Sequence, residues 1–176
     1  LVDRHKRGRL RHRGDTKFIY RQDNDFSSKT NRKGALKSYI DDKGNLLPAN
    51  PNGSASIQSH VRGGISKDSP FISFTDPSHS NGVKSYGREK ISVNLKKLGD
   101  DIKAGKLPNT QIISHNELKS SLQKSVNEAT IRYESNPTPK NRARLERAVN
   151  DLNNVKRDGE CLIKGCIPSE YIFRSK

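Results

Sequence analysis

Residues 158–168 of the chain are DGECLIKGCIP, and this stretch decides the fold. The apolar run 160–164 (ECLIK) predicts a β-strand, and Gly165 predicts a turn directly after it. Ile167-Pro168 follows the turn, and a last short strand is expected at 171–173 (YIF). Because helical sequence precedes this stretch, we expect the chain to return here from helices to a sheet.

The sequence before this stretch predicts two helices. Ser114 and Glu117 form a capping-box pair that starts the first helix. The segment 136–139 (NPTP) ends it, and a second amphipathic helix follows. Apolar residues recur at helical spacing in both segments: Leu118, Leu122 and Val126, then Leu145, Val149 and Leu152. We therefore expect a helical hairpin at about 114–157, inserted before the strand.

Three earlier runs predict further strands: 17–21 (KFIYR), 71–75 (FISFT) and 90–95 (KISVNL). The last of these alternates between apolar and polar residues, as a half-buried strand does. Residues 32–40 predict a short helix that ends at 41–44 (DDKG). Short strands around helices place the chain in the α+β class.

Composition limits the other possibilities. The chain has 176 residues, of which 30% are hydrophobic, and it lacks an apolar run long enough for a transmembrane helix. Its charged N-terminal sequence predicts no signal peptide. Residues 1–16 carry the basic run 4–13 (RHKRGRLRHR) and are expected to form a flexible arm, followed by a single domain at 17–176. Because the chain begins with Leu1, we expect a piece of a longer protein.

Charge is the most unusual property of the sequence. Lys and Arg number 34 against 19 Asp and Glu, which gives a formal net charge of +15. Such an excess favours anionic partners, nucleic acid among them, although it also improves solubility or attracts an acidic protein. The two cysteines have C-x4-C spacing without a second pair, which argues against a zinc site.

Four short pieces occur in a distinctive order: 20–23 (YRQD), 60–63 (HVRG), 71–75 (FISFT) and 158–160 (DGE), the last followed by 167–168 (IP). Together they resemble the mono-ADP-ribosyltransferase toxins, in the branch of cholera toxin, heat-labile enterotoxin and pertussis toxin. That family carries Y-R-x-D on a first strand, then a His, an S-T-S strand, and E-x-E or Q-x-E before Ile-Pro.

The resemblance covers roughly residues 17–98 and 156–174. It implies a core of two small packed β-sheets flanked by helices, with the hairpin as an insertion before the catalytic strand. It also implies an enzyme that breaks the nicotinamide–ribose bond of NAD and transfers ADP-ribose to a macromolecule of a target cell, with a protein side chain favoured as acceptor. NAD is then a substrate, and no metal is needed.

The resemblance assigns roles to individual residues. Glu160 would lie beside the ribose and stabilise its developing positive charge. Arg21 would bind a phosphate of NAD, and Ser73 would fix the Glu160 side chain. His60 would contact the ribose or order the site. Asp158 would steer or deprotonate the acceptor, since side chains two apart on a strand share a face.

Two further residues support the site in this interpretation: Thr75 through its strand and Arg62 through its loop. The chain also departs from the family pattern at two positions. Asp158 stands where the family has Glu or Gln, and it reaches less far. Phe74 replaces a small hydroxyl residue. Because side chains alternate along a strand, the Phe74 side chain is expected to point away from the face that carries Ser73.

Other functions stay open from the sequence. A basic nuclease or tRNA-targeting toxin would use His60, His115 and Glu160, and a hybrid would transfer ADP-ribose to nucleic acid. A non-enzymatic binding module fits less well, because aromatic residues are few and no helix-turn-helix or zinc-finger signature occurs. The resemblance implies a secreted or delivered bacterial effector, acting in the target-cell cytosol, with an acidic immunity or carrier protein as a further partner.

Overall fold

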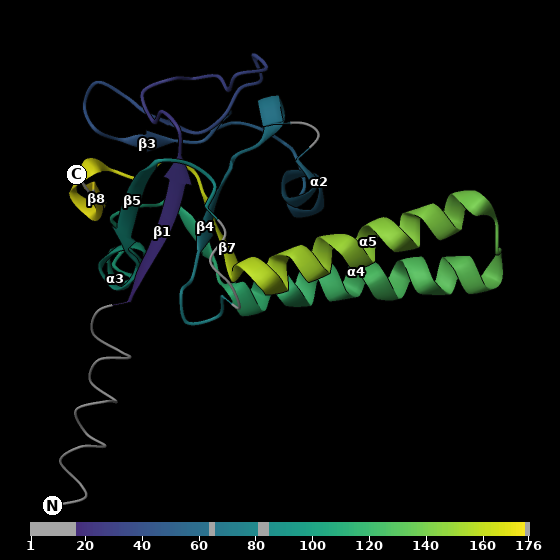
Figure 1. Ribbon diagram of the computed structural model, residues 1–176. Helices are drawn as coiled ribbons and strands as arrows, with labels where there is room; N and C mark the ends of the chain where they lie inside the picture. The colour runs from purple at the N-terminus through teal and green to yellow at the C-terminus, as the bar shows by residue number, and fades with distance from the viewer. Residues whose placement is uncertain (1–16, 64–65, 81–84, 175–176) are drawn as a thin grey trace, which may run out of the picture.

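The computed structural model describes residues 17–63, 66–80 and 85–174 (Figure 1). The basic arm expected at 1–16 lies outside the described residues. Within the described part of the chain, helices and antiparallel strands are mixed, which confirms the α+β class.

The strands form two sheets of unequal size. The strands of the main sheet are β1 (Phe18–Asp23), β4 (Phe71–Thr75), β5 (Glu89–Asn94), β6 (Gln111–Ile113), β7 (Glu160–Lys164) and β8 (Ile172–Arg174). Across the described residues their order is β6-β7-β4-β1-β5-β8, and every neighbouring pair is antiparallel. The small sheet pairs β2 (Tyr39–Ile40) with β3 (Leu46–Leu47). The described residues therefore form one six-stranded sheet and one two-stranded ribbon, and the core of two small packed β-sheets that the resemblance implies stays a prediction.

The main sheet is nearly divided between β1 and β4. Strands β4 and β7 are paired at five positions and β1 and β5 at six, whereas in the described residues β1 meets β4 at Tyr20 and Thr75 alone. Beyond this pair the two strands part. The sheet thus consists of two halves, β6-β7-β4 and β1-β5-β8, and side chains of both halves meet where β1 and β4 separate.

Alternation along β4 and β7 gives each face of the sheet its own core. On one face Cys161 and Ile163 of β7 join a cluster with residues of β1 and β5. On the other face Leu162 packs with Phe71 against the helices. Strand β7 is thus buried on both of its faces, which explains why its apolar residues follow one another without alternation.

The predicted helical hairpin is confirmed as α4 (His115–Ser135) and α5 (Pro139–Asp158). The Ser114 hydroxyl caps α4, the Thr138 hydroxyl caps α5, and Pro139 occupies the first turn of α5. Figure 1 shows the two helices side by side, projecting from the sheet. In the part of the chain that the structure describes, no helix is both long and apolar enough to cross a membrane.

Two shorter helices complete the fold. Helix α2 (Ile57–Arg62) covers a stretch whose type the sequence left open, and α3 (Leu95–Lys103) begins after a cap by Asn94. Single turns of 3₁₀ helix lie at Ser66–Asp68 and Ser169–Tyr171.

The helix predicted at 32–40 is wrong. Those residues form turns and then β2. The reason is a turn with its own backbone pairing: Thr30 and Leu36 form an antiparallel bridge, and the Asn31 N–H donates to the Ala35 carbonyl. Gly34 within this turn has a φ of +79°, which a right-handed helix cannot contain.

Gly159 joins α5 to β7 and cannot be replaced without strain. Its φ is +59°, and an added Cβ would lie 2.7 Å from the Asp76 carbonyl oxygen. We expect Gly159→Ala to lower the free energy of unfolding by about 1–3 kcal/mol more than Gly105→Ala. Gly105 is the matched control, because its φ is +77° but a Cβ added there would meet nothing within 4 Å. Urea denaturation of the two variants measures this; equal losses would contradict the clash.

Candidate active site

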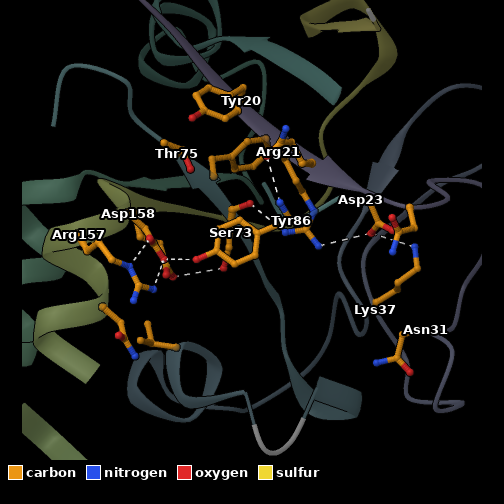
Figure 2. A pocket seen from close by; sticks show the side chains of 16 residues that line it. Tyr20, Arg21, Asp23, Asn31, Lys37, Ser73, Thr75, Tyr86, Arg157 and Asp158 are labelled. Atoms are coloured by element: carbon orange, nitrogen blue, oxygen red, sulfur yellow. Dashed lines mark hydrogen bonds and ion pairs between the residues drawn. The ribbon is translucent and has the colours of Figure 1, made fainter. Parts of the chain in front are cut away.

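A pocket of about 590 Å³ opens where β1 and β4 part (Figure 2). The strands supply one wall of it: Tyr20 and Arg21 from β1, Ser73 and Thr75 from β4, and Glu160 from β7. The end of α5 supplies the opposite wall, and Tyr86 stands between the two. The structure thus brings most of the residues singled out in the sequence to one place.

Glu160 is the first residue of β7 and is paired across the strands with Thr75. Its backbone carbonyl accepts a hydrogen bond from Nδ1 of His115, at 2.8 Å, which fixes the start of the strand. The Ser73 hydroxyl lies 3.3 Å from its Oε2. Burial raises the pKa of the Glu160 carboxyl to about 7, although the Ser73 hydrogen bond and Arg21 oppose this.

His60 lies behind Ser73, on α2. Its Nε2 is 2.7 Å from the Ser73 hydroxyl, and its Nδ1 is 2.6 Å from the Ser69 hydroxyl. Burial, with help from the nearby charge of Arg21, lowers the pKa of His60 to about 4. The ring is therefore neutral at neutral pH, with one nitrogen donating and the other accepting.

The Ser73 hydroxyl has one proton, and the use of that proton assigns the tautomer of His60. When Glu160 is ionised, Ser73 donates its proton to Oε2 of the carboxylate. Nε2 of His60 then donates to the Ser73 oxygen, and Nδ1 accepts from the Ser69 hydroxyl, which itself accepts the backbone N–H of Phe71 at 3.2 Å. This order of donors matches the carboxylate form of Glu160.

Arg21 crosses the gap between the two strands. Its Nη1 donates to the Ser73 carbonyl at 3.1 Å, and its Nη2 lies 3.8 Å from a carboxylate oxygen of Asp23, which also binds Lys37. Burial lowers the pKa of Arg21. Its Nε and the Ser38 hydroxyl are the buried side-chain N and O atoms of the described residues that lack a partner.

A second cavity, of about 250 Å³, adjoins the first, and both Arg21 and Ser38 line it. A buried guanidinium N–H without an acceptor costs free energy. Arg21 also lines both cavities, so its guanidinium is a candidate cation for a phosphate bound there.

Asp158 lines the pocket, but not in the way expected. It is the last residue of α5, and the left-handed Gly159 separates it from β7, so the strand argument for a shared face is wrong. Its carboxylate is held by Arg157, at 2.9 and 3.2 Å, and by the Tyr86 hydroxyl (Figure 2). The helix end, and not strand alternation, aims Asp158 at the pocket.

Of the two residues expected to support the site, Thr75 and Arg62, one lies in the pocket and the other outside it. Thr75 lines the pocket beside Glu160, whereas Arg62 is not brought to it. Arg62 binds the Asp151 carboxylate through Nε at 3.2 Å and Nη2 at 2.9 Å. It therefore ties α2, and with it His60, to α5.

Sequence reasoning missed Ser69, Arg157 and Lys37. Ser69 has no local signal, because its role depends on α2 folding against it. Arg157 is adjacent to Asp158, and this Arg-Asp dipeptide was available as a hint. Lys37 fell in the predicted helix at 32–40. Among the described residues, no group of three or more His, Cys, Asp and Glu is placed to hold a metal ion.

Ser69 should determine the tautomer of His60. In Ser69→Ala, Nδ1 loses its donor, so we expect neutral His60 to populate both tautomers, where the native protein has the Nε2–H form. The ¹⁵N chemical shifts of the ring, from long-range ¹H–¹⁵N spectra, report this directly. Ser38→Ala is the control, since it removes a buried hydroxyl that has no partner in the described structure. Unchanged ring shifts in Ser69→Ala would refute the assignment.

Glu160 should make stability fall as pH rises. The folded state keeps a proton up to a pKa of about 7, whereas the unfolded chain releases it near 4.5, so between these values ionisation favours unfolding. Glu160→Gln removes this effect. We expect its unfolding free energy, relative to the native protein, to rise by about 2–3 kcal/mol between pH 5 and pH 8. Denaturation curves at the two pH values test this, and a constant difference would contradict a raised pKa.

Comparison with known proteins adds no family to this description: no family model, no curated protein and no solved structure matches the chain. The function therefore has to be inferred from the pocket.

Proposed function

We propose that this chain is an NAD-dependent mono-ADP-ribosyltransferase, the effector domain of a larger bacterial toxin. The observation that carries the proposal is the arrangement of Glu160, Ser73 and His60 beside Arg21, in a pocket between two halves of a sheet. A carboxylate and a phosphate-binding cation in one pocket match the two parts of NAD that such a reaction must hold.

The reaction breaks the bond between the nicotinamide nitrogen and C1′ of the ribose. The bonding electrons leave with nicotinamide, which departs neutral, and positive charge develops on the ribose. A carboxylate next to C1′ stabilises that charge. An acceptor atom then bonds to C1′ and loses its proton to a base.

The chain's residues would divide this work between them. Glu160 would stabilise the cationic ribose and accept a hydrogen bond from a ribose hydroxyl. The relay from His60 through Ser73 would hold the carboxylate in place and favour its ionised form. Arg21, which lines the pocket, would bind the pyrophosphate through its guanidinium.

Asp158 would act on the side of the acceptor. Arg157 and the Tyr86 hydroxyl hold its carboxylate at the pocket wall, where an acceptor would approach it. We extend the proposal to a secreted or delivered effector in the target-cell cytosol, where its basic surface would suit an acidic immunity or carrier protein.

The nuclease alternative finds less support in the pocket. Both ring nitrogens of His60 are engaged by serine hydroxyls, and Nδ1 of His115 is bound to the Glu160 carbonyl. Burial lowers the pKa of both imidazoles. Neither ring is poised to exchange a proton with a phosphodiester.

Glu160→Gln should abolish transfer while the fold persists. We expect labelling of a target-cell lysate from radiolabelled NAD to fall by about a hundredfold or more, because an amide does not stabilise the ribose cation. The matched control is Glu128→Gln, an exposed change on α4 with the same loss of charge.

Circular dichroism should show equal helix content in the native protein and both variants. Undiminished labelling by Glu160→Gln would overturn the proposal, and so would a native protein that does not cleave NAD.

A further inference from the structure

One face of α5 leads into the pocket. Asn154, Arg157 and Asp158, near its end, line the pocket wall. One turn earlier, Asp151 lies on the side of α5 that faces α2, where it binds Arg62. This face of the helix thus runs from the pocket past α2.

The same face continues outward with three cations. Lys140, Arg144 and Arg147 precede Asp151 at spacings of three or four residues, so they follow one another along one face of the helix. All three are exposed. Within the described residues, none of them has an ion pair or a side-chain hydrogen bond, unlike Arg62. We call these three residues the basic track.

The basic track lies where the hairpin leaves the body of the protein. Figure 1 shows the far half of α4 and α5 projecting beyond α2 and the sheet. At about 1.5 Å per residue, Arg147 is about 16 Å and Lys140 about 27 Å along the helix from Asp158. A molecule that touches both the pocket and the basic track is therefore a macromolecule.

We propose that the basic track binds the phosphodiester backbone of a nucleic acid and leads it to the pocket. A duplex carries one negative charge per about 1.7 Å, so about 16 phosphate charges cover the distance from Asp158 to Lys140. Guanidinium groups such as those of Arg144 and Arg147 bind phosphates through paired hydrogen bonds.

The side chains of α5 favour contact with the sugar-phosphate backbone of a nucleic acid and not with its bases. Helix α5 contains no Phe, Tyr or Trp, so it offers no ring on which a base could stack. The helix can therefore bind phosphates through its positive charge and its arginine side chains, and such binding does not depend on the nucleotide sequence.

Binding by the basic track does not depend on the proposed reaction. That the bound nucleic acid is the acceptor of ADP-ribose does rest on the proposed function. The two statements can fail separately, and the experiment measures them separately.

The test compares two double variants with equal changes in charge. Arg144→Glu with Arg147→Glu reverses the basic track. Lys119→Glu with Lys156→Glu is the control, since both lysines line a separate hollow formed by α4 and α5. Fluorescence anisotropy measures binding of labelled RNA and DNA duplexes of about 20 base pairs, from about 50 to about 200 mM salt.

We expect the track variant to bind at least about tenfold more weakly, with a salt slope smaller by about 2, and the control to stay within about twofold of the native protein. Both variants should cleave NAD at the native rate without nucleic acid. Comparison of the two duplexes tells RNA from DNA as the preferred ligand.

Equal weakening in both variants would overturn the proposal, because it would show that charge alone matters. Absence of duplex binding by the native protein would also overturn it, as would tighter binding of poly-glutamate, which indicates an acidic protein instead. If the native protein does not cleave NAD but the two variants differ as expected, the proposed function fails and the basic track stands.

Discussion

The hydrogen bond from Arg21 to the Ser73 carbonyl is the contact on which the site depends. It lies where the ladder between β1 and β4 ends after the Tyr20–Thr75 pair, and it spans the gap with a side chain in place of backbone pairing. Continued pairing would bring the strands to ladder spacing and leave no pocket between them. Arg21 thus holds the two halves of the sheet together and lines the cavity between them.

Ser73 contacts three other residues of the site: Arg21, His60 and Glu160. Its carbonyl receives Arg21 from β1, and its hydroxyl connects His60 of α2 with Glu160 of β7. Three elements distant in the sequence are therefore positioned through one residue of β4. These bonds offset part of the cost of burying a carboxyl and an imidazole, although burial still raises the pKa of Glu160 and lowers that of His60.

The sequence predicts well what local pattern controls. The hairpin follows from apolar spacing and from the Ser114 cap. The contact between Ser73 and Glu160, which the family resemblance implies, is present as a hydrogen bond. Sequence patterns do not predict a side chain's position when that position depends on contacts with residues far away in the sequence. Nothing near Ser69 indicates its place beside the imidazole, and nothing near Arg62 indicates a partner 89 positions away. At 32–40 a turn through Gly34 and the pairing of Thr30 with Leu36 replace the predicted helix.

The helical hairpin also has a consequence for folding kinetics. It joins β6 to β7, which are neighbours in the sheet, and its two helices pack mainly on each other. Local contacts of this kind form early, because little loop-closure entropy opposes them. Once the hairpin exists, its two ends are close, and His115 at one end meets the carbonyl of Glu160 at the other. We therefore expect the strand that carries the catalytic candidate to join the sheet after the hairpin has formed.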